Sequence, residues 1–191
     1  MKPLALVTND DGIESAFLEV LVNALTAHFR VAVAAPASEQ SWIGRALTRK
    51  GELTVRHDKD RFEGAPEAWA ISGTPSDCVN IGLGNLLQET PAIVCSGINI
   101  GYNTTETLIL SSGTIAGAIE GASWAIPAIA FSQCVPNDLF ELVQNNHGKI
   151  DHHFAKVLHH SAAHAAEIAK STLENPEKPG RVINVLSLIH I

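Results

Sequence analysis

The amino-acid sequence predicts an α/β protein built around a mostly parallel sheet. Short apolar runs at residues 4–7, 30–35, 92–95 and 128–132 are each followed by polar or small residues. Segments with helical spacing or helix-start signals lie between most of these runs. Strands that are covered by helices on both faces have this composition, so the pattern indicates buried parallel strands.

Length and composition are those of one globular domain. The chain has 191 residues, of which 46% are apolar and 17% charged, which suits a single core. The net charge of −7, without a cluster of Lys or Arg, argues against a nucleic-acid polymer as a partner. No apolar run has the length that a bilayer requires and no signal peptide is evident, so we expect a cytoplasmic protein without membrane contact. The distant Cys78, Cys95 and Cys134 are expected to be reduced thiols.

The first three elements predict a βαβ unit. After the strand at 4–7, residues 15–28 place one apolar stripe at helical spacing, formed by Phe17, Leu18, Leu21, Val22 and Leu25. A strand at 30–35 follows and is halted by Pro36. In a right-handed βαβ unit both strands end at the same edge of the sheet, so the loops that follow them should meet there.

The turn after the first strand is acidic. Asp10 and Asp11 could aim at one point where the chain turns at Gly12, because glycine permits unusual backbone angles. Two carboxylates so close together favour a hard divalent cation as their neutraliser. The alternative is that Asn9 or Asp10 only caps the next helix, a common role for these residue types.

The loop at 36–44 should open beside this acidic turn. Ser41 offers a neutral oxygen to a cation, although a serine often hydrogen-bonds within its own turn instead. Residues 46–69 are polar and alternating, and residues 52–56 resemble an edge hairpin. A helix then starts with Thr74 as N-cap, and Asp77 in its first turn is read as part of the cap rather than as a ligand.

Asparagines and hydroxyl groups follow the strand at 92–95. Asn99 and Asn103 would bring a carbonyl oxygen for a metal and an amide N–H for a phosphate to the same edge, unless they only serve a glycine-rich turn. Ser112, Gly113 and Thr114 precede a helix at 115–124 rich in Ala and Gly. Its amino end could hold an anion, or could simply be capped by Ser112 or Thr114.

The last third of the chain predicts a long helix with several histidines. His160 and His164 have the spacing of a chelating pair, but no H-E-x-x-H motif accompanies them. We therefore interpret the histidines as a solvated helix face, formed by His152, His153, His159, His160 and His164.

Five blocks of residues together resemble the SurE family, the survival protein E nucleotidases and acid phosphatases. They occur in the family's order over about residues 4–132. These blocks are residues 8–13, residues 35–36 with 39–41, residues 73–78, residues 96–99 with Gly101 and Asn103, and residues 112–114.

The resemblance implies a Rossmann-like, three-layer α/β/α core around the mostly parallel sheet. It also implies a metal-dependent phosphomonoesterase that hydrolyses nucleoside monophosphates as a 5′/3′-nucleotidase, working as a homodimer or homotetramer. It implies one divalent cation per subunit, Mg²⁺ or Mn²⁺, on Asp10, Asp11, Ser41 and Asn99. It implies a phosphate seat formed by Asn9, Asn103, Ser112, Gly113 and Thr114. Asp11 is the catalytic candidate, together with a metal-bound water as the nucleophile. We prefer this water to direct attack by Asp11, because an enzyme that forms a phosphoaspartate would have D-x-D rather than adjacent aspartates. The alternatives are a non-catalytic nucleotide-binding module and an inactive fragment of the enzyme.

The sequence departs from the family's pattern at several positions. Trp42 stands where the family usually has glycine, and Ser111 replaces a frequent tyrosine. The family also continues past the strand expected at 181–185 into an oligomerisation arm. Here residues 186–191 read LSLIHI, which the transposase adapter CTGTCTCTTATACACATC encodes in frame. We therefore expect a single domain over 1–185 and a non-native tail at 186–191; intact codons in a genomic clone would contradict this.

Overall fold

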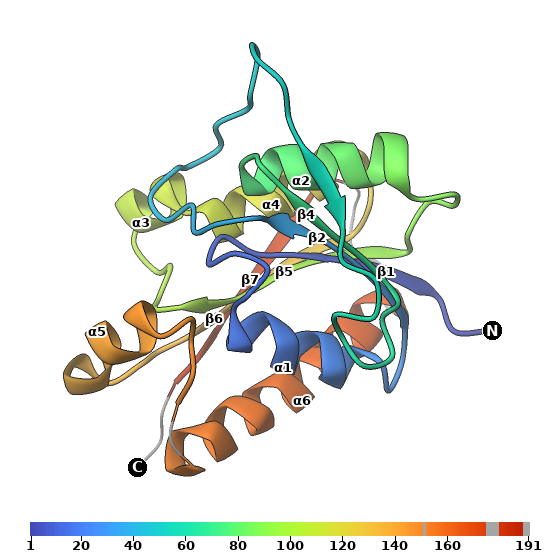
Figure 1. The fold of residues 1–191 in the computed structure, drawn as a ribbon. Helices are drawn as coiled ribbons and strands as arrows, with labels where there is room; N and C mark the ends of the chain where they lie inside the picture. The colour runs from blue at the N-terminus through green and yellow to red at the C-terminus, as the bar shows by residue number, and fades with distance from the viewer. Residues whose placement is uncertain (151, 175–179, 189–191) are drawn as a thin grey trace.

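The fold is a seven-stranded sheet in the order β3-β4-β2-β1-β5-β6-β7 (Figure 1). A computed structural model describes residues 1–150, 152–174 and 180–188. Neighbouring strands are parallel except for the pair β3 and β4. The strands are β1 Leu4–Thr8, β2 Arg30–Pro36, β3 Val55–His57, β4 Glu67–Ile71, β5 Ile93–Ile100, β6 Ala128–Gln133 and β7 Val182–Ser187. The predicted fold class is therefore confirmed.

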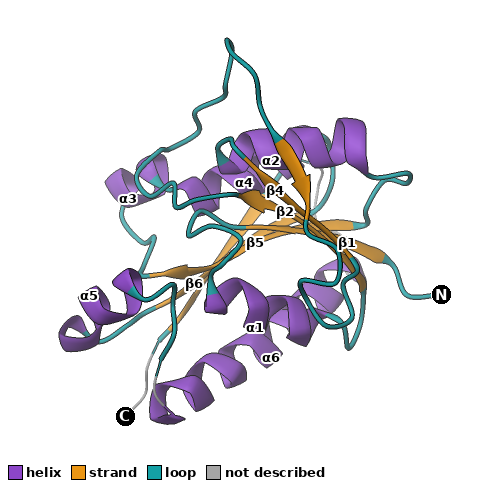
Figure 2. Ribbon diagram, viewed as in Figure 1, coloured by secondary structure: helices purple, strands orange, loops and turns teal. Residues whose placement is uncertain are grey.

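Helices cover both faces of this sheet (Figure 2). Helices α1 and α6 pack on one face, whereas α2 and α4 pack on the other. The two remaining helices, α3 and α5, lie beyond the end of the sheet at which β1 and β5 finish. The helices are α1 Ala16–Leu25, α2 Pro75–Ile81 with a π-helical continuation at Gly82–Leu86, α3 Glu106–Ser111, α4 Gly113–Ser123, α5 Asn137–Asn145 and α6 His152–Glu174.

The strands alternate between two apolar cores. In β1, Ala5 and Val7 join the core under α1 and α6, while Leu4 and Leu6 join the core under α2 and α4. This two-residue period follows from the pleat of a strand. On the second face α4 lies very close to the sheet: a Cβ at Gly121 would stand 2.6 Å from Val94 Cβ. The small Ala and Gly side chains of this helix permit such close packing.

The topology creates a crevice beside β1. The chain proceeds from β1 to β2 and β4 on one side, and then returns to place β5, β6 and β7 on the other. In open α/β sheets such a switch point leaves a crevice at the carboxyl ends of the two strands that flank it. The acidic turn after β1 and the asparagine near the end of β5 both lie there.

Several boundaries differ from those expected. Strand β5 continues to Ile100, since Ile98 and Ile100 bury their side chains beyond the glycine that seemed to end it. The expected edge position is confirmed for β3, which begins within the predicted residues 52–56 and pairs antiparallel with β4. Strand β4 itself and the helices α3 and α5 were not anticipated. These short elements are held by tertiary packing, and their own sequences carry little periodicity.

The final segments partly match the expectations. His159, His160 and His164 are exposed on α6, and the rings of His160 and His164 lie 4.4 Å apart. Strand β7 includes Leu186 and Ser187, which we had placed in the non-native tail. Residues 189–191 of that tail lie outside the described residues. In the part of the chain that the structure describes, no helix combines the length and apolarity needed to cross a membrane.

Candidate functional site

The acidic turn is built by backbone contacts with the neighbouring loop. The Gln40 N–H donates to the Asp10 carbonyl oxygen at 2.7 Å, and Asn9 Nδ2 donates to the Gly12 carbonyl oxygen at 2.9 Å. Asn9 therefore shapes the turn. Helix α1 has Ser15 as its N-cap, without a side-chain cap hydrogen bond. Neither Asn9 nor Asp10 caps this helix, so the capping alternative does not explain the acidic turn.

The Asp10 carboxylate faces the amino end of α4. Both the hydroxyl and the backbone N–H of Thr114 donate to it. Gly113 allows this approach, because a Cβ there would stand 2.7 Å from Asp10 Cβ. An anion at this end of a helix is stabilised by the helix dipole. The N-cap of α4 is Ser112, whose hydroxyl oxygen accepts from the Ile115 N–H at 3.1 Å.

The two carboxyl groups are electrostatically strained. Asp10 is buried, with 4% of its surface exposed, and Asp11 is half-buried. Burial raises the pKa of Asp10 despite its hydrogen bonds to Thr114. Burial, followed by the charge of Asp10, raises the pKa of Asp11 well above its ordinary value, although the Ile100 N–H donates to Asp11 Oδ2 at 3.3 Å. The pair therefore favours a proton or a cation as a neutraliser.

A pocket of about 270 Å³ opens at this edge of the sheet. It gathers many of the residues that the sequence singled out, namely Asp10, Ser41, Asn99, Asn103 and Ser112. Asp11 reaches the same wall through its contact with Ile100, which also lines the pocket. Gly113, Thr114 and Asn9 stand outside the lining; Gly113 and Thr114 pack directly against Asp10.

The pocket's polar side chains keep unused hydrogen-bonding capacity. Among the described residues, the Ser41 hydroxyl has no side-chain hydrogen bond, so it is not spent on its own turn. Asn103 is buried and donates through Nδ2 to Ser132 Oγ at 3.1 Å, which leaves one amide hydrogen. Ser112 uses its oxygen as an acceptor and keeps its hydroxyl hydrogen. Thr114, in contrast, donates both its hydroxyl and its backbone N–H to Asp10 and keeps no free donor.

Apolar side chains form the other part of the pocket, and most of them were not anticipated. Trp42 was noted as a departure from the family's pattern, but no local signal placed the remainder here. They come from the end of β5, from α3 and from α5, and comprise Ile100, Tyr102, Leu108 and Phe140, with Gln144 beside them.

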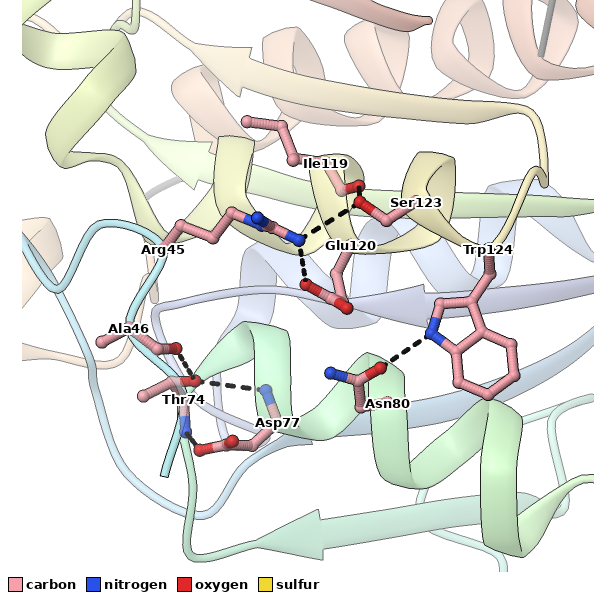
Figure 3. Close-up of polar contacts among 9 residues, drawn as sticks. All are labelled: Arg45, Ala46, Thr74, Asp77, Asn80, Ile119, Glu120, Ser123 and Trp124. Carbon is pink, nitrogen blue, oxygen red and sulfur yellow. Dashed lines mark hydrogen bonds and ion pairs between the residues drawn. The ribbon is translucent and has the colours of Figure 1, made fainter. Parts of the chain in front are cut away.

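The loop that carries Ser41 is tied to two helices (Figure 3). Arg45 forms an ion pair with the buried Glu120 of α4 at 2.8 Å and donates to Ser123 Oγ at 3.2 Å. Thr74 Oγ1 donates to the Ala46 carbonyl oxygen at 2.7 Å. These contacts tie the loop to the carboxyl-terminal half of α4 and to the N-cap of α2.

Asp77 serves as the cap that the sequence predicted and also binds this loop. Thr74 and Asp77 form the reciprocal capping box of α2. The Thr48 N–H and hydroxyl donate to the two carboxylate oxygens of Asp77, at 2.9 Å and 2.7 Å. Burial alone would raise the pKa of Asp77, but the hydrogen bonds from Thr48 and Thr74 outweigh it and lower the pKa.

Trp42 has an unfavourable conformation at the pocket wall. Its φ is 61°, in the left-handed region, and 70% of its surface is exposed. For a bulky residue that backbone conformation costs about 1 to 2 kcal/mol. Nothing in the folding of the loop calls for tryptophan at this position, where glycine would be unstrained.

A cation at this site would depend on neutral ligands as well as carboxylates. Among the described residues, no group of three His, Cys, Asp or Glu side chains gathers where it could hold a metal ion. Cys78 and Cys95 belong to the cores, where burial raises the pKa of Cys95 to about 12.

Comparison with known proteins finds a family model that matches nearly the whole chain and relatives that match most of it. The family model described as "Survival protein SurE" matches residues 5–186. The 5′-nucleotidase SurE of Methanosarcina barkeri is 42% identical over 135 residues, which cover 71% of this chain and 49% of that protein. The 5′-nucleotidase SurE of Methanobrevibacter smithii is 38% identical over 151 residues, covering 79% and 57%.

A solved structure agrees with these matches. The crystal structure of the SurE protein from Aquifex aeolicus has a TM-score of 0.72 and 32% identity, covering 96% of this chain and 66% of that chain. The chain spans about half the length of the curated relatives it matches. The match of the family model over nearly all of the chain, together with the shared fold, shows that this chain belongs to the SurE family.

Proposed function

We propose that this chain carries the active site of a metal-dependent phosphomonoesterase that releases phosphate from nucleoside monophosphates, at the 5′ or 3′ position. The observation that carries the proposal is the pair of adjacent carboxyl groups, Asp10 and Asp11, whose pKa values are raised by burial beside a polar pocket. Two relatives named 5′-nucleotidase SurE support the substrate class.

The residues present fit one hard divalent cation, Mg²⁺ or Mn²⁺. Asp10 and Asp11 would supply anionic oxygens, and Ser41 and Asn99 would supply neutral ones. The fit rests on the chemistry of these groups. Among the described residues, no positive charge neutralises the carboxyl pair and Ser41 Oγ has no partner, and all four residues offer oxygen ligands. When bound, such a cation supplies polarisation of the phosphoryl group and acidification of a water molecule.

The chain's own groups would bind and orient the phosphate. Asn103 has one uncommitted amide hydrogen and Ser112 has its hydroxyl hydrogen, and both side chains line the pocket. Donors that are fixed before the substrate arrives stabilise the charge that grows on phosphoryl oxygens during transfer. Thr114 and Gly113 would act indirectly, by positioning the Asp10 carboxylate at the start of α4. Asn9 acts in the same way by shaping the turn.

The working form in this proposal is a homodimer or homotetramer in the cytoplasm, with a small nucleotide as substrate. A second candidate is a nucleotide-binding module that holds phosphate without cleaving it. The uncommitted donors of Asn103 and Ser112 would serve that role equally well. A third candidate is an inactive fragment of the enzyme, which would release no phosphate from any nucleotide.

Phosphate release separates these candidates. The 191-residue protein and a clone that extends past Val185 would be supplied with a panel of 5′- and 3′-nucleoside monophosphates, together with Mg²⁺, Mn²⁺ or a chelator. We expect metal-dependent release that Asp11→Asn abolishes. Glu174→Gln, a matched loss of one surface carboxylate on α6, should leave the rate unchanged. Nucleotide binding without release under any metal would favour the binding module.

A further inference from the structure

Among the described residues, the side chain of Trp42 takes part in no hydrogen bond or ion pair that would explain its presence. Its backbone is in the left-handed region with φ 61°, and 70% of the residue's surface is exposed. Within the described residues, no other aromatic ring or cation packs on its indole. A strained backbone and an exposed tryptophan both oppose folding, so a ligand is the natural reason for this residue.

The loop holds Trp42 in a fixed position. On one side the Gln40 N–H donates to the Asp10 carbonyl oxygen at 2.7 Å, and on the other the Gly44 N–H donates to the Ser111 carbonyl oxygen at 2.8 Å. The following residue, Arg45, is tied to Glu120 of α4 (Figure 3). A rigid aromatic surface loses little entropy when a ligand packs on it.

The pocket has two chemically different parts. Asp10, Asn99, Asn103 and Ser112 form its polar part, where the phosphate would lie. Its apolar part is formed by Trp42, Tyr102, Leu108 and Phe140. The volume of about 270 Å³ lies just below the usual range for small-molecule pockets, which begins at about 300 Å³. Such a pocket suits a ligand with an anionic group at one end and a flat, weakly polar ring at the other.

We infer that Trp42 is the surface on which the base of the nucleotide stacks. The inference rests on the proposed function and adds a specificity-determining residue to it. Every base offers a π-face, so stacking on an indole favours any nucleotide over a phosphate ester that lacks a base. Gln144 at the same wall carries both a donor and an acceptor, which suits purines and pyrimidines alike. The site should therefore be selective for nucleotides while tolerating different bases.

Kinetics of two substitutions test the inference. Trp42→Gly removes the ring and relieves the positive φ, so the variant should fold; Trp42→Phe keeps an aromatic face. We expect Trp42→Gly to raise the KM for adenosine monophosphate by about tenfold, with kcat changed much less. Trp42→Phe should stay close to wild type, and the KM for ribose 5-phosphate should be the same in all three proteins. An unchanged KM for adenosine monophosphate, or equal losses with both substrates, would overturn the inference.

A second copy of the chain is the competing occupant of this exposed surface, which also includes Leu110 and the partly exposed Ile43. Size-exclusion chromatography with light scattering measures the oligomeric state of the same variants. We expect the molar mass to be unaffected by Trp42→Gly. A loss of the oligomer in Trp42→Gly, with the KM for adenosine monophosphate unchanged, would assign Trp42 to an interface instead.

A fluorescence titration tests stacking without any catalysis. Adenosine carries no phosphate to release, so its binding does not depend on the proposed activity. We expect adenosine to quench the tryptophan fluorescence of wild type and of Trp124→Phe, and to have no effect on Trp42→Phe. If no nucleotide releases phosphate, the proposed function fails while the quenching still supports stacking. If phosphate is released but quenching is absent or persists in Trp42→Phe, the stacking inference fails alone.

Discussion

The two parts of the pocket differ in how the fold holds them. The polar part lies at the ends of β1 and β5 and at the start of α4, where Asp10 is buried and bonded to Thr114. The apolar part lies on a loop and on short helices, where Trp42 and Tyr102 are 70% and 53% exposed. The carboxyl groups that would hold the cation are fixed by the sheet and by α4, whereas the side chains that would select the ligand stand on surface segments that tolerate change. Ser41 is the exception among the proposed cation ligands, because it lies on the same loop as Trp42.

The largest expected effect lies in the polar part. Gly113→Ala would place a Cβ 2.7 Å from Asp10 Cβ and 3.0 Å from Asp10 Oδ2, so α4 or the acidic turn must shift. We expect a loss of stability of about 1 to 3 kcal/mol and at least a hundredfold loss of phosphate release. Urea unfolding and a phosphate assay measure both.

Gly84→Ala is the matched control, because its Cβ would meet Trp124 at an ordinary 3.6 Å. It should retain wild-type activity. If Gly113→Ala were as active as this control, close contact between α4 and Asp10 would be unimportant for the site.

The second prediction concerns pH in the presence of a chelator. Because folding raises the pKa of Asp11, the folded state holds its proton more tightly than the unfolded chain does. Stability should therefore fall as the pH rises from about 4, the unfolded pKa, through the folded pKa of Asp11. Asp11→Asn should remove this part of the slope, as urea unfolding at a series of pH values would show. A wild-type curve parallel to that of Asp11→Asn would contradict the raised pKa.

The third prediction concerns the contact between Asp77 and Thr48, which ties the loop that carries Ser41 and Trp42 to α2. Asp77→Asn removes the charge that accepts hydrogen bonds from Thr48 and Thr74, and should cost about 1 to 2 kcal/mol at pH 7. The lowered pKa of Asp77 means that its contribution is present above the unfolded pKa and disappears as the pH falls through the folded one. Chemical denaturation measures the difference. Asp58→Asn, at a surface pair with Arg56, should unfold like wild type; equal behaviour of the two variants would show that Asp77 does not hold the loop.

The smallest expected effect is on the stability of the apolar part. Trp42→Gly should stabilise the protein by about 1 kcal/mol or less, because glycine adopts φ 61° without strain but gains freedom in the unfolded chain. Ala125→Gly, at φ 60° beyond α4, is the matched control and should behave alike in thermal unfolding. A clear loss of stability in Trp42→Gly alone would indicate that the indole supports the fold.

The sequence predicted the polar part far better than the apolar one. Apolar runs and the acidic turn indicated β1, α1 and β2, and parallel topology brought Asn99 and Asn103 to the same edge. The role of Thr114 was less visible, since its contact with Asp10 joins positions 104 residues apart. Phe140 and Gln144 could not be placed, because α5 reaches the pocket by tertiary packing that no local pattern encodes.

The most direct test of the account measures cation occupancy and phosphate release in the same sample. Mn²⁺ would be titrated into chelator-treated protein with adenosine monophosphate present, while bound Mn²⁺ and free phosphate are followed together. We predict that the rate rises in proportion to occupancy and saturates at one ion per chain, and that Asp11→Asn shows neither. Full release of phosphate at zero occupancy, or saturation of the site without any release, would contradict the proposed metal-dependent phosphomonoesterase.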